Sequence, residues 1–473
     1  MKSLADDTKI PIPRTEYMKV EPEDLEGKIG TRHWQIFLMF LGMVMAYALR
    51  VNMSVTIVAM ADSSSANIDF ETYDWNEWTK SIILSSFFWG YTIMQLPSGY
   101  LAQHWSAQRL LSTGMFICSI LNMLVPLAAK YGDWGAVCAC RVGMGLSQAC
   151  LMPSLHTMLS KWVPPTERAR LGTFAYAGAQ FGTVIAMPIS GYLAASSIGW
   201  PSVFYVFGTV SLLWTILFYI CGADSPAQSK MISFDEKKFI QDSFNAESTK
   251  SEEKHVTPWV NICTSMPMWA IIIAHCGQSW GFWMLLTEIP SYMNAILSFD
   301  IKKNGLMSAL PYLTMWLLSF PISWCSDYAL KKGATRSLVR KISNTIANWG
   351  PAAALVALCF APADNVVLVV VILVFAVGLN AGSMCGFQIN HIDLSPNNAG
   401  SMMAITNCAA AVVAIVSPLI AGVIITDENN VSQWHIVFYL TAAIYFIDNL
   451  IFIIFGRGEV QWWNDPSAKK PLK

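Results

Sequence analysis

The chain has 473 residues, of which 54% are hydrophobic and 13% are charged, and its formal net charge is −1. The apolar residues come in long uninterrupted blocks, which is typical of a polytopic membrane protein rather than a soluble domain. The net charge says nothing about partners. We expect the lipid bilayer and small solutes, and no nucleic acid.

The first 32 residues are polar and carry both signs of charge, so we expect a cytoplasmic N-terminus and no cleavable signal peptide. The eleven cysteines, an odd number, lie within or beside apolar segments and lack paired C-x-x-C spacing. This pattern indicates small buried hydrophobic side chains rather than a disulfide framework or a metal site. We expect no cofactor.

The apolar blocks predict an all-α polytopic fold, because about 20 apolar residues suffice for a helix to cross the hydrocarbon core. We expect twelve transmembrane helices, roughly at 34–61, 80–101, 108–129, 134–159, 170–195, 201–222, 267–294, 304–328, 338–360, 364–388, 397–424 and 432–455.

Lysine and arginine are distributed unevenly between the two sides of these spans. With the N-terminus inside, 24 of the 30 residues lie in inward segments and three lie in outward loops. The positive-inside rule therefore predicts that both ends of the chain are cytoplasmic.

A polar segment at 223–266 divides the spans into two groups of six. The segments "VPPTERARLGTFAYAGAQFGTVIAMPISG" and "LSPNNAGSMMAITNCAAAVVAIVSPLIAG" echo each other about 230 residues apart, which indicates an internal repeat. We expect an N-terminal tail (1–33), a six-helix bundle (34–222), a cytoplasmic linker (223–266), a second six-helix bundle (267–455) and a C-terminal tail (456–473). This is the organisation of the major facilitator superfamily.

Arg50 lies inside the first predicted span, about 11 residues or roughly 17 Å from its outer end. A charge at this depth must face the bundle interior. Helical spacing places Tyr47, Arg50 and Ser54 on one stripe. A guanidinium flanked by two hydroxyls would suit a carboxylate or a phosphate.

The fourth span carries a second cation. In "CRVGMGLSQACLMP", Arg141, Gly145 and Gln148 share one helix face, and the glycines permit close approach of a neighbour. We expect Glu288 to be the only deep acid, and one acid cannot balance two arginines. Anion recognition is therefore favoured over structural pairing for the two arginines together.

Other ionisable residues in or beside the spans have open roles. Glu288 is a partner of an arginine, a proton or sodium site, or a gate contact. His275 is an interior histidine or a proton relay, and His391 follows the tenth span. The loops after the second and the eighth predicted spans each resemble a superfamily pattern that contains an acidic residue. The first loop has Gln103 at that position and the second has Asp327. We expect Asp327 to have a structural role at the cytoplasmic gate.

Several stretches together resemble one family: "YALRVNMSV", "SSFFWGYTIMQLPSGYLA", "SKWVPPTERARLGTFAYAGAQFGTVIAMPISG", "GWPSVFYVFG", "RKISNTIANWGPA" and "GFQINHIDLSPNNAG". They resemble the anion/cation symporter family of the major facilitator superfamily, which includes sialin, the vesicular glutamate transporters and the type I sodium-dependent phosphate cotransporters. "AHCGQSWGFWMLLTEIPSYM" resembles the invertebrate group that carries the provisional name inorganic phosphate cotransporter.

The resemblance links Arg50 and Arg141 to anion transport. At three positions, however, this sequence differs from members of that family. Leu84 and Gln278 stand where vesicular glutamate transporters have a histidine and an arginine, and Gln148 stands where they and sialin have a glutamate. These differences argue against vesicular glutamate loading. A glutamine cannot exchange a proton, which weakens proton coupling of the sialin kind.

We expect a secondary active transporter, not an enzyme, that moves inorganic phosphate or a small organic anion with sodium or a proton by alternating access. One alternative is a proton-coupled exporter of acidic sugars or other organic anions from lysosome-like compartments. Another is a non-transporting receptor with the same fold. The plasma membrane and an endolysosomal or vesicular membrane are both open, and we expect a functional monomer.

Overall fold

The computed structural model describes residues 29–61, 69–164, 167–248, 258–362 and 365–464. The described part of the chain is helical and contains no strand. The predicted N-terminal tail lies mostly outside these residues, as do 465–473 of the predicted C-terminal tail and 249–257 of the predicted linker.

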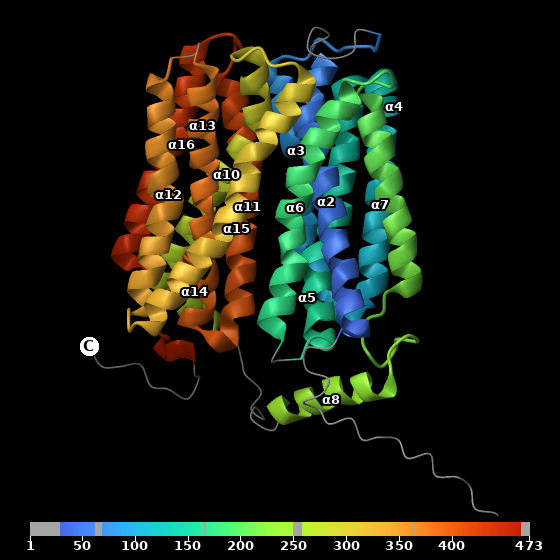
Figure 1. Ribbon diagram of the computed structural model, residues 1–473, viewed down its shortest axis with the longest axis vertical. Coiled ribbons are helices and arrows are strands. Elements are labelled where there is room, and N and C mark those ends of the chain that lie inside the picture. The colour runs from blue at the N-terminus through green and yellow to red at the C-terminus, as the bar shows by residue number, and fades with distance from the viewer. Residues whose placement is uncertain (1–28, 62–68, 165–166, 249–257, 363–364, 465–473) are drawn as a thin grey trace, which may run out of the picture.

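Figure 1 shows two helical bundles standing side by side. The first is formed by α2 (Thr31–Ala61), α3 (Glu77–His104), α4 (Ala107–Gln148), α5 (Leu151–Trp162), α6 (Arg168–Ala194) and α7 (Pro201–Cys221). The helix α8 (Phe234–Ser248) lies beyond one end of the bundles, which we call the linker side; the opposite end is the far side.

The second bundle follows the short helix α9 (Trp259–Cys263). It comprises α10 (Met266–Ala295), α11 (Ile301–Lys331), α12 (Arg336–Phe360), α13 (Val366–Gly378), η1 (Leu379–Met384), α14 (Phe387–Leu394), η2 (Pro396–Asn398), α15 (Ala399–Ile424) and α16 (Val431–Phe455), and η3 (Trp462–Asn464) follows it.

The helices account for the twelve predicted spans. By length and apolar composition alone, seven stretches of the described residues could cross a membrane, and one of them, Ala107–Trp162, contains both the third and the fourth predicted span. The remaining four spans are α3, α6, α10 and α12, which have 25 to 30 residues each but do not reach that apolar composition. The predicted all-α polytopic fold is confirmed.

Two predicted spans are interrupted. The stretch 134–159 breaks after Gln148, where α4 ends and α5 begins. The stretch 364–388 breaks at 379–386, where a 3₁₀ turn separates α13 from α14, and α14 then continues to Leu394. The third and fourth predicted spans are two helices within α4, which meet at Asp133, where the backbone is non-helical with a φ of 50°.

The start of α2 is held by acidic side chains from elsewhere in the chain. Glu236 of α8 accepts the backbone N–H groups of Thr31 and Arg32 at 2.9 and 3.0 Å. Its carboxylate also pairs with the buried Arg32 guanidinium at 3.0 Å, and Glu167 pairs with the same guanidinium at 2.8 Å. Because helix N-termini carry unpaired donors, a carboxylate placed there caps α2 and ties α8 to the first bundle.

The helices α3 and α4 contact each other backbone to backbone. A Cβ on Gly90 would overlap the carbonyl oxygen of Val142, and a Cβ on Gly145 would overlap that of Phe87. The predicted close approach at Gly145 is therefore confirmed. This contact fixes the register between the helices that carry Phe87 and Arg141.

The two bundles contact each other toward the far side. Lys80 of α3 pairs with Glu428, which precedes α16, at 2.6 Å, and with Glu77 at 2.8 Å. Next to this pair, a Cβ on Gly422 of α15 would overlap the Ser81 side chain. The far side is thus the closed side of this conformation.

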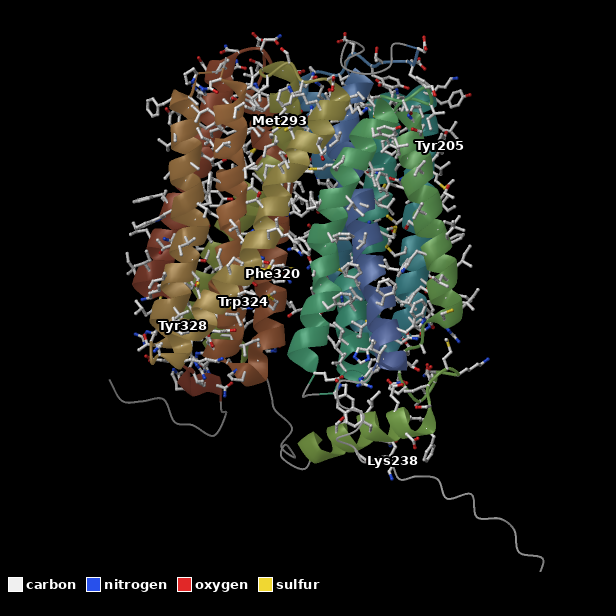
Figure 2. All side chains as sticks on the ribbon, viewed as in Figure 1. Tyr205, Lys238, Met293, Phe320, Trp324 and Tyr328 are labelled. Atoms are coloured by element: carbon white, nitrogen blue, oxygen red, sulfur yellow. The ribbon has the colours of Figure 1, made fainter. Side chains whose placement is uncertain are left out.

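The outer surfaces of the helices carry large apolar side chains. Tyr205, Phe320, Trp324 and Tyr328 are exposed, and they are labelled in Figure 2 together with Lys238 of α8. Large apolar residues on the outside of long helices are the side chains expected to contact lipid.

Substituting Gly145 by valine will destabilise the protein. The added side chain overlaps the α3 backbone, and overpacking of this kind typically costs about 1–3 kcal/mol. The thermal melting temperature in detergent will fall. Gly135→Val is the matched control, because nothing lies within 4 Å of its Cβ position. Equal melting temperatures for the two variants would contradict the close contact.

Lys80→Glu will open the far side, because it places a third acid beside Glu77 and Glu428. The double variant Lys80→Glu/Glu428→Lys will close it again. The measurement is the distance by pulsed electron resonance between spin labels at Tyr131→Cys and Phe360→Cys, with the exposed Cys263 and Cys325 replaced by serine. An unchanged distance in Lys80→Glu would rule out this ion pair as a closure contact.

Candidate anion-binding site

The two interrupted helices occupy equivalent places in the repeat. One break follows Gln148 and the other lies at 379–386, about 230 residues apart. Broken helices at corresponding positions of two repeats are typical of transporter binding sites, because the freed backbone groups line the centre. The first break lies directly beside the arginines predicted from the sequence.

Arg50 lies in the interior of α2 and is 6% exposed. Its Nη2 donates to Oε1 of Gln148 at 3.1 Å. Its Nε atom is buried and has no hydrogen-bond partner among the described residues. No described carboxylate lies within ion-pair distance of it. The guanidinium therefore retains a positive charge and a free donor.

Aromatic rings surround the Arg50 guanidinium. The centroids of Tyr47, Phe87, Tyr91 and Trp283 lie 4.7, 4.8, 5.0 and 5.8 Å from its central carbon. Ring faces attract a cation, and such contacts are worth about 2 kcal/mol or more when desolvated. Trp283 comes from α10, so the second bundle contributes one wall and the site lies between the bundles.

Arg141 is also buried, and backbone oxygens surround it. Its guanidinium donates to the carbonyl groups of Ile83, Leu84 and Arg50, each at 3.4 Å. Its central carbon lies 5.4 Å from the Phe87 ring centroid, the same ring that contacts Arg50. The structure thus brings the two predicted cations to one aromatic side chain. Arg141 is therefore held by backbone oxygens of α3 and α2, whereas the hydrogen bond of Arg50 is to the side chain of Gln148.

The other predicted binding residues divide into two groups. Tyr47 and Gln148 contact Arg50 directly. Gln148 is itself fixed, because its Nε2 donates to the carbonyl of Ala46 at 3.0 Å. Ser54 donates instead to the carbonyl of Val51 at 2.7 Å, so its hydroxyl is engaged with its own helix.

Glu288 does not pair with either arginine. Its carboxylate accepts from the Thr287 hydroxyl at 3.1 Å and lies within electrostatic range of Glu77, Lys80 and Glu428. It is therefore grouped with the charges that close the far side. Of the three roles that the sequence left open, this position favours the gate contact.

The remaining gating and coupling candidates lie away from Arg50. The His275 ring packs on Phe387 with centroids 5.0 Å apart, and its buried Nδ1 has no hydrogen-bond partner among the residues described. Both ring nitrogens of His391 have partners, the carbonyl of Gln388 and the hydroxyl of Thr406. Asp327 is exposed and makes no ion pair among the described residues.

The prediction that Glu288 is the only deep acid was wrong. Asp448 in α16 is 2% exposed and lies seven residues from the end of its helix. A single acid in the run "IYFIDNLIFIIF" was the signal that could have found it. Three buried ion pairs were also missed: those of Arg32 with Glu167 and with Glu236, and that of Arg340 with Asp393 at 2.6 Å.

The arrangement around Arg50 can bind an anion. A buried guanidinium with a free donor, no acid partner and a bundle interface beside it can receive a carboxylate or a phosphate through charge-assisted hydrogen bonds. The charge of Arg141, held nearby, adds to the attraction.

Comparisons with known proteins found a matching family profile and several similar sequences. Residues 37–418 match the profile of the Major Facilitator Superfamily. A Drosophila ananassae protein provisionally named inorganic phosphate cotransporter is 43% identical over 455 residues, covering 91% of this chain and 93% of that protein. Human sialin is 38% identical over 456 residues, with coverage of 92% and 91%.

A solved structure shows the same fold. A bacterial homologue of the human lysosomal transporter Spinster aligns with a TM-score of 0.68 at 13% sequence identity. The alignment covers 91% of this chain and 99% of that chain.

Proposed function

The chain belongs to the major facilitator superfamily, and from this premise we propose that it is a secondary active transporter that carries inorganic phosphate or a small organic anion together with a coupling cation. The protein is a multi-pass membrane transporter related to anion carriers. The identity of the anion follows the names of these relatives and is part of the proposal.

One observation carries the proposal: Arg50 is a buried cation without an acid partner at the interface between the bundles. An unpaired charge at this depth is costly, by at least about 2.5–3.5 kcal/mol on insertion scales. A fixed acid would remove that cost permanently. A transported anion removes it only while bound, which is the behaviour that a carrier needs.

The transport cycle follows from where the bundles touch. Closure at Lys80 and Glu428 seals the far side, so the anion reaches Arg50 from the linker side. Opening of the far side and closure of the linker side would expose the same residue to the other compartment. We place the linker side in the cytoplasm, as the lysine and arginine distribution predicts.

Arg50→Ala and Arg141→Ala will each abolish saturable anion uptake while the protein still reaches the membrane. Each charge-assisted hydrogen bond that is lost contributes about 1.5–3 kcal/mol, which corresponds to a roughly 10- to 150-fold loss of affinity. Arg109→Ala is the control, because this arginine is exposed at the start of α4. Undiminished uptake in either variant would remove that residue from the site.

A flux assay identifies the substrate and the coupling ion. Purified protein in proteoliposomes is given labelled phosphate against a panel of organic anions, with sodium and pH varied independently. We expect saturable uptake of at least one anion that depends on one cation gradient. Preference for acidic sugars driven by protons would favour the lysosomal exporter. Binding without flux would favour the receptor and contradict the proposal.

A further inference from the structure

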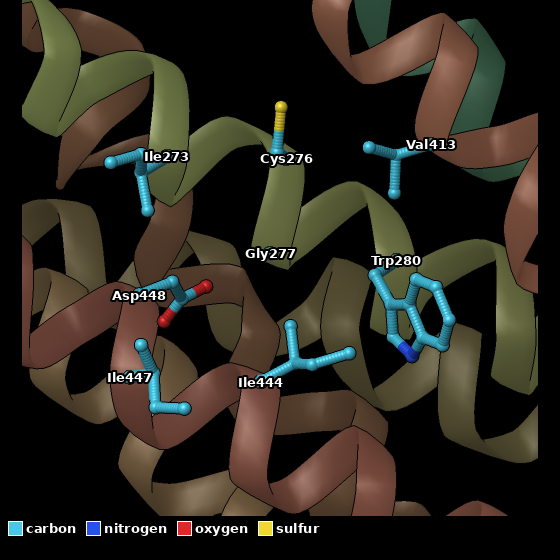
Figure 3. Close-up of a pocket in the computed structure, with 8 residues that line it drawn as sticks. All are labelled: Ile273, Cys276, Gly277, Trp280, Val413, Ile444, Ile447 and Asp448. Atoms are coloured by element: carbon cyan, nitrogen blue, oxygen red, sulfur yellow. The ribbon is translucent and has the colours of Figure 1, made fainter.

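Asp448 lines a pocket of about 220 Å³ at the junction of α10, α15 and α16. Both carboxyl oxygens are buried and have no hydrogen-bond partner among the described residues. Figure 3 shows the carboxyl beside Ile444 and Ile447 and across from the Gly277 backbone. The other lining residues are Ile273, Cys276, Trp280 and Val413.

The internal repeat shows which residue of the first bundle corresponds to Asp448. The segments "VFYVFGTVSLLWTILFYICG" (203–222) and "VFYLTAAIYFIDNLIFIIFG" (437–456) share their first three residues and their final glycine, and they place Trp214 opposite Asp448. In the first bundle the Trp214 ring fills the space over Gly42, and its Nε1 donates to the carbonyl of Leu38 at 3.1 Å.

The same contact in the second bundle has different chemistry. A Cβ on Gly277 would overlap the Asp448 carboxyl, just as a Cβ on Gly42 would meet the Trp214 ring. The shorter aspartate fills less of the space than an indole does, so a pocket remains. One repeat therefore has a satisfied aromatic residue at this place, and the other has an unsatisfied acid.

No ion pair joins the acid to a cation in the part of the chain that the structure describes. The titratable groups that face it are the Cys276 thiol of α10 and the Tyr445 hydroxyl of α16, while α15 contributes Val413. Asp448 lies seven residues, or roughly 10 Å, from the helix end at Phe455. An ionised carboxylate at such depth requires a partner or water, and this conformation provides no protein partner.

We propose that Asp448 is the site that binds the coupling proton of the transport cycle, an inference that rests on the proposed function. In the conformation described, the carboxyl holds the proton. On release, the O–H bond breaks, the electron pair stays on the carboxylate, and the proton passes to water.

Proton release at Asp448 is linked to the anion site through α10. The carboxyl lies directly against Gly277, so a movement of α10 relative to α16 changes the surroundings of the acid. The same α10 carries Trp283, which covers Arg50. A movement of α10 that hydrates the acid therefore also changes the wall of the anion site.

The test compares wild type with Asp448→Asn, which resembles the protonated acid, in proteoliposomes. The probe is labelled inorganic phosphate or, if phosphate is not carried, the anion of the panel that wild type takes up. We expect the variant to keep anion exchange at equal pH and to lose accumulation driven by a pH gradient. Asp74→Asn, the same change in an exposed loop, will keep both.

Three results would overturn the proposal: proton-driven accumulation in Asp448→Asn, loss of exchange as well in a folded variant, or sodium-driven accumulation in wild type that does not depend on pH. Infrared spectroscopy supplies a readout that does not need transport. The C=O band of a protonated carboxyl should be present in wild type and lost in Asp448→Asn. If the proposed function is wrong, the wild type will show no flux. The infrared measurement will still show whether Asp448 is protonated.

Discussion

A guanidinium without a carboxylate partner determines how the centre of this protein is built. Arg50 is buried in α2, where an amide oxygen and the faces of aromatic rings stabilise its charge. These contacts make burial tolerable without neutralising the charge, because neither an amide nor an aromatic ring carries a formal negative charge. The surrounding structure then serves to hold the rings in place: glycines bring α3 against α4, and α10 contributes Trp283 from the other bundle.

Charged residues that form ion pairs and charged residues that do not lie at different depths in the bundles. Fixed ion pairs lie near the two ends: Arg32 with Glu167 and Glu236, Arg340 with Asp393, and Lys80 with Glu428. They hold helices or bundles together. Arg50 and Asp448, which form no ion pair among the described residues, lie deeper. An unpaired group can change its partner during a cycle, whereas a buried pair resists change because breaking it is strongly destabilising.

Much of this could be predicted from the sequence, because the signals are local. Apolar block length predicts the spans, and helical spacing places Tyr47 and Gln148 with the arginines. The aromatic wall from α10 could not be predicted, since it depends on how the bundles dock. The engagement of Ser54 with its own backbone and the distance between Glu288 and Arg50 are likewise tertiary facts. Asp448 and the break at 379–386 left visible signals, an acid in an apolar run and a glycine-rich "GLNAGSMCGF".

Direct binding of the anion to purified protein tests the central claim about Arg50 most directly, because it separates recognition from movement. Calorimetric titration of wild type with the transported anion should give saturable binding. Arg50→Ala should show none over the same concentration range, although its helical content and melting temperature are retained. Binding to folded Arg50→Ala with wild-type affinity would contradict the account, because the anion would then be held elsewhere.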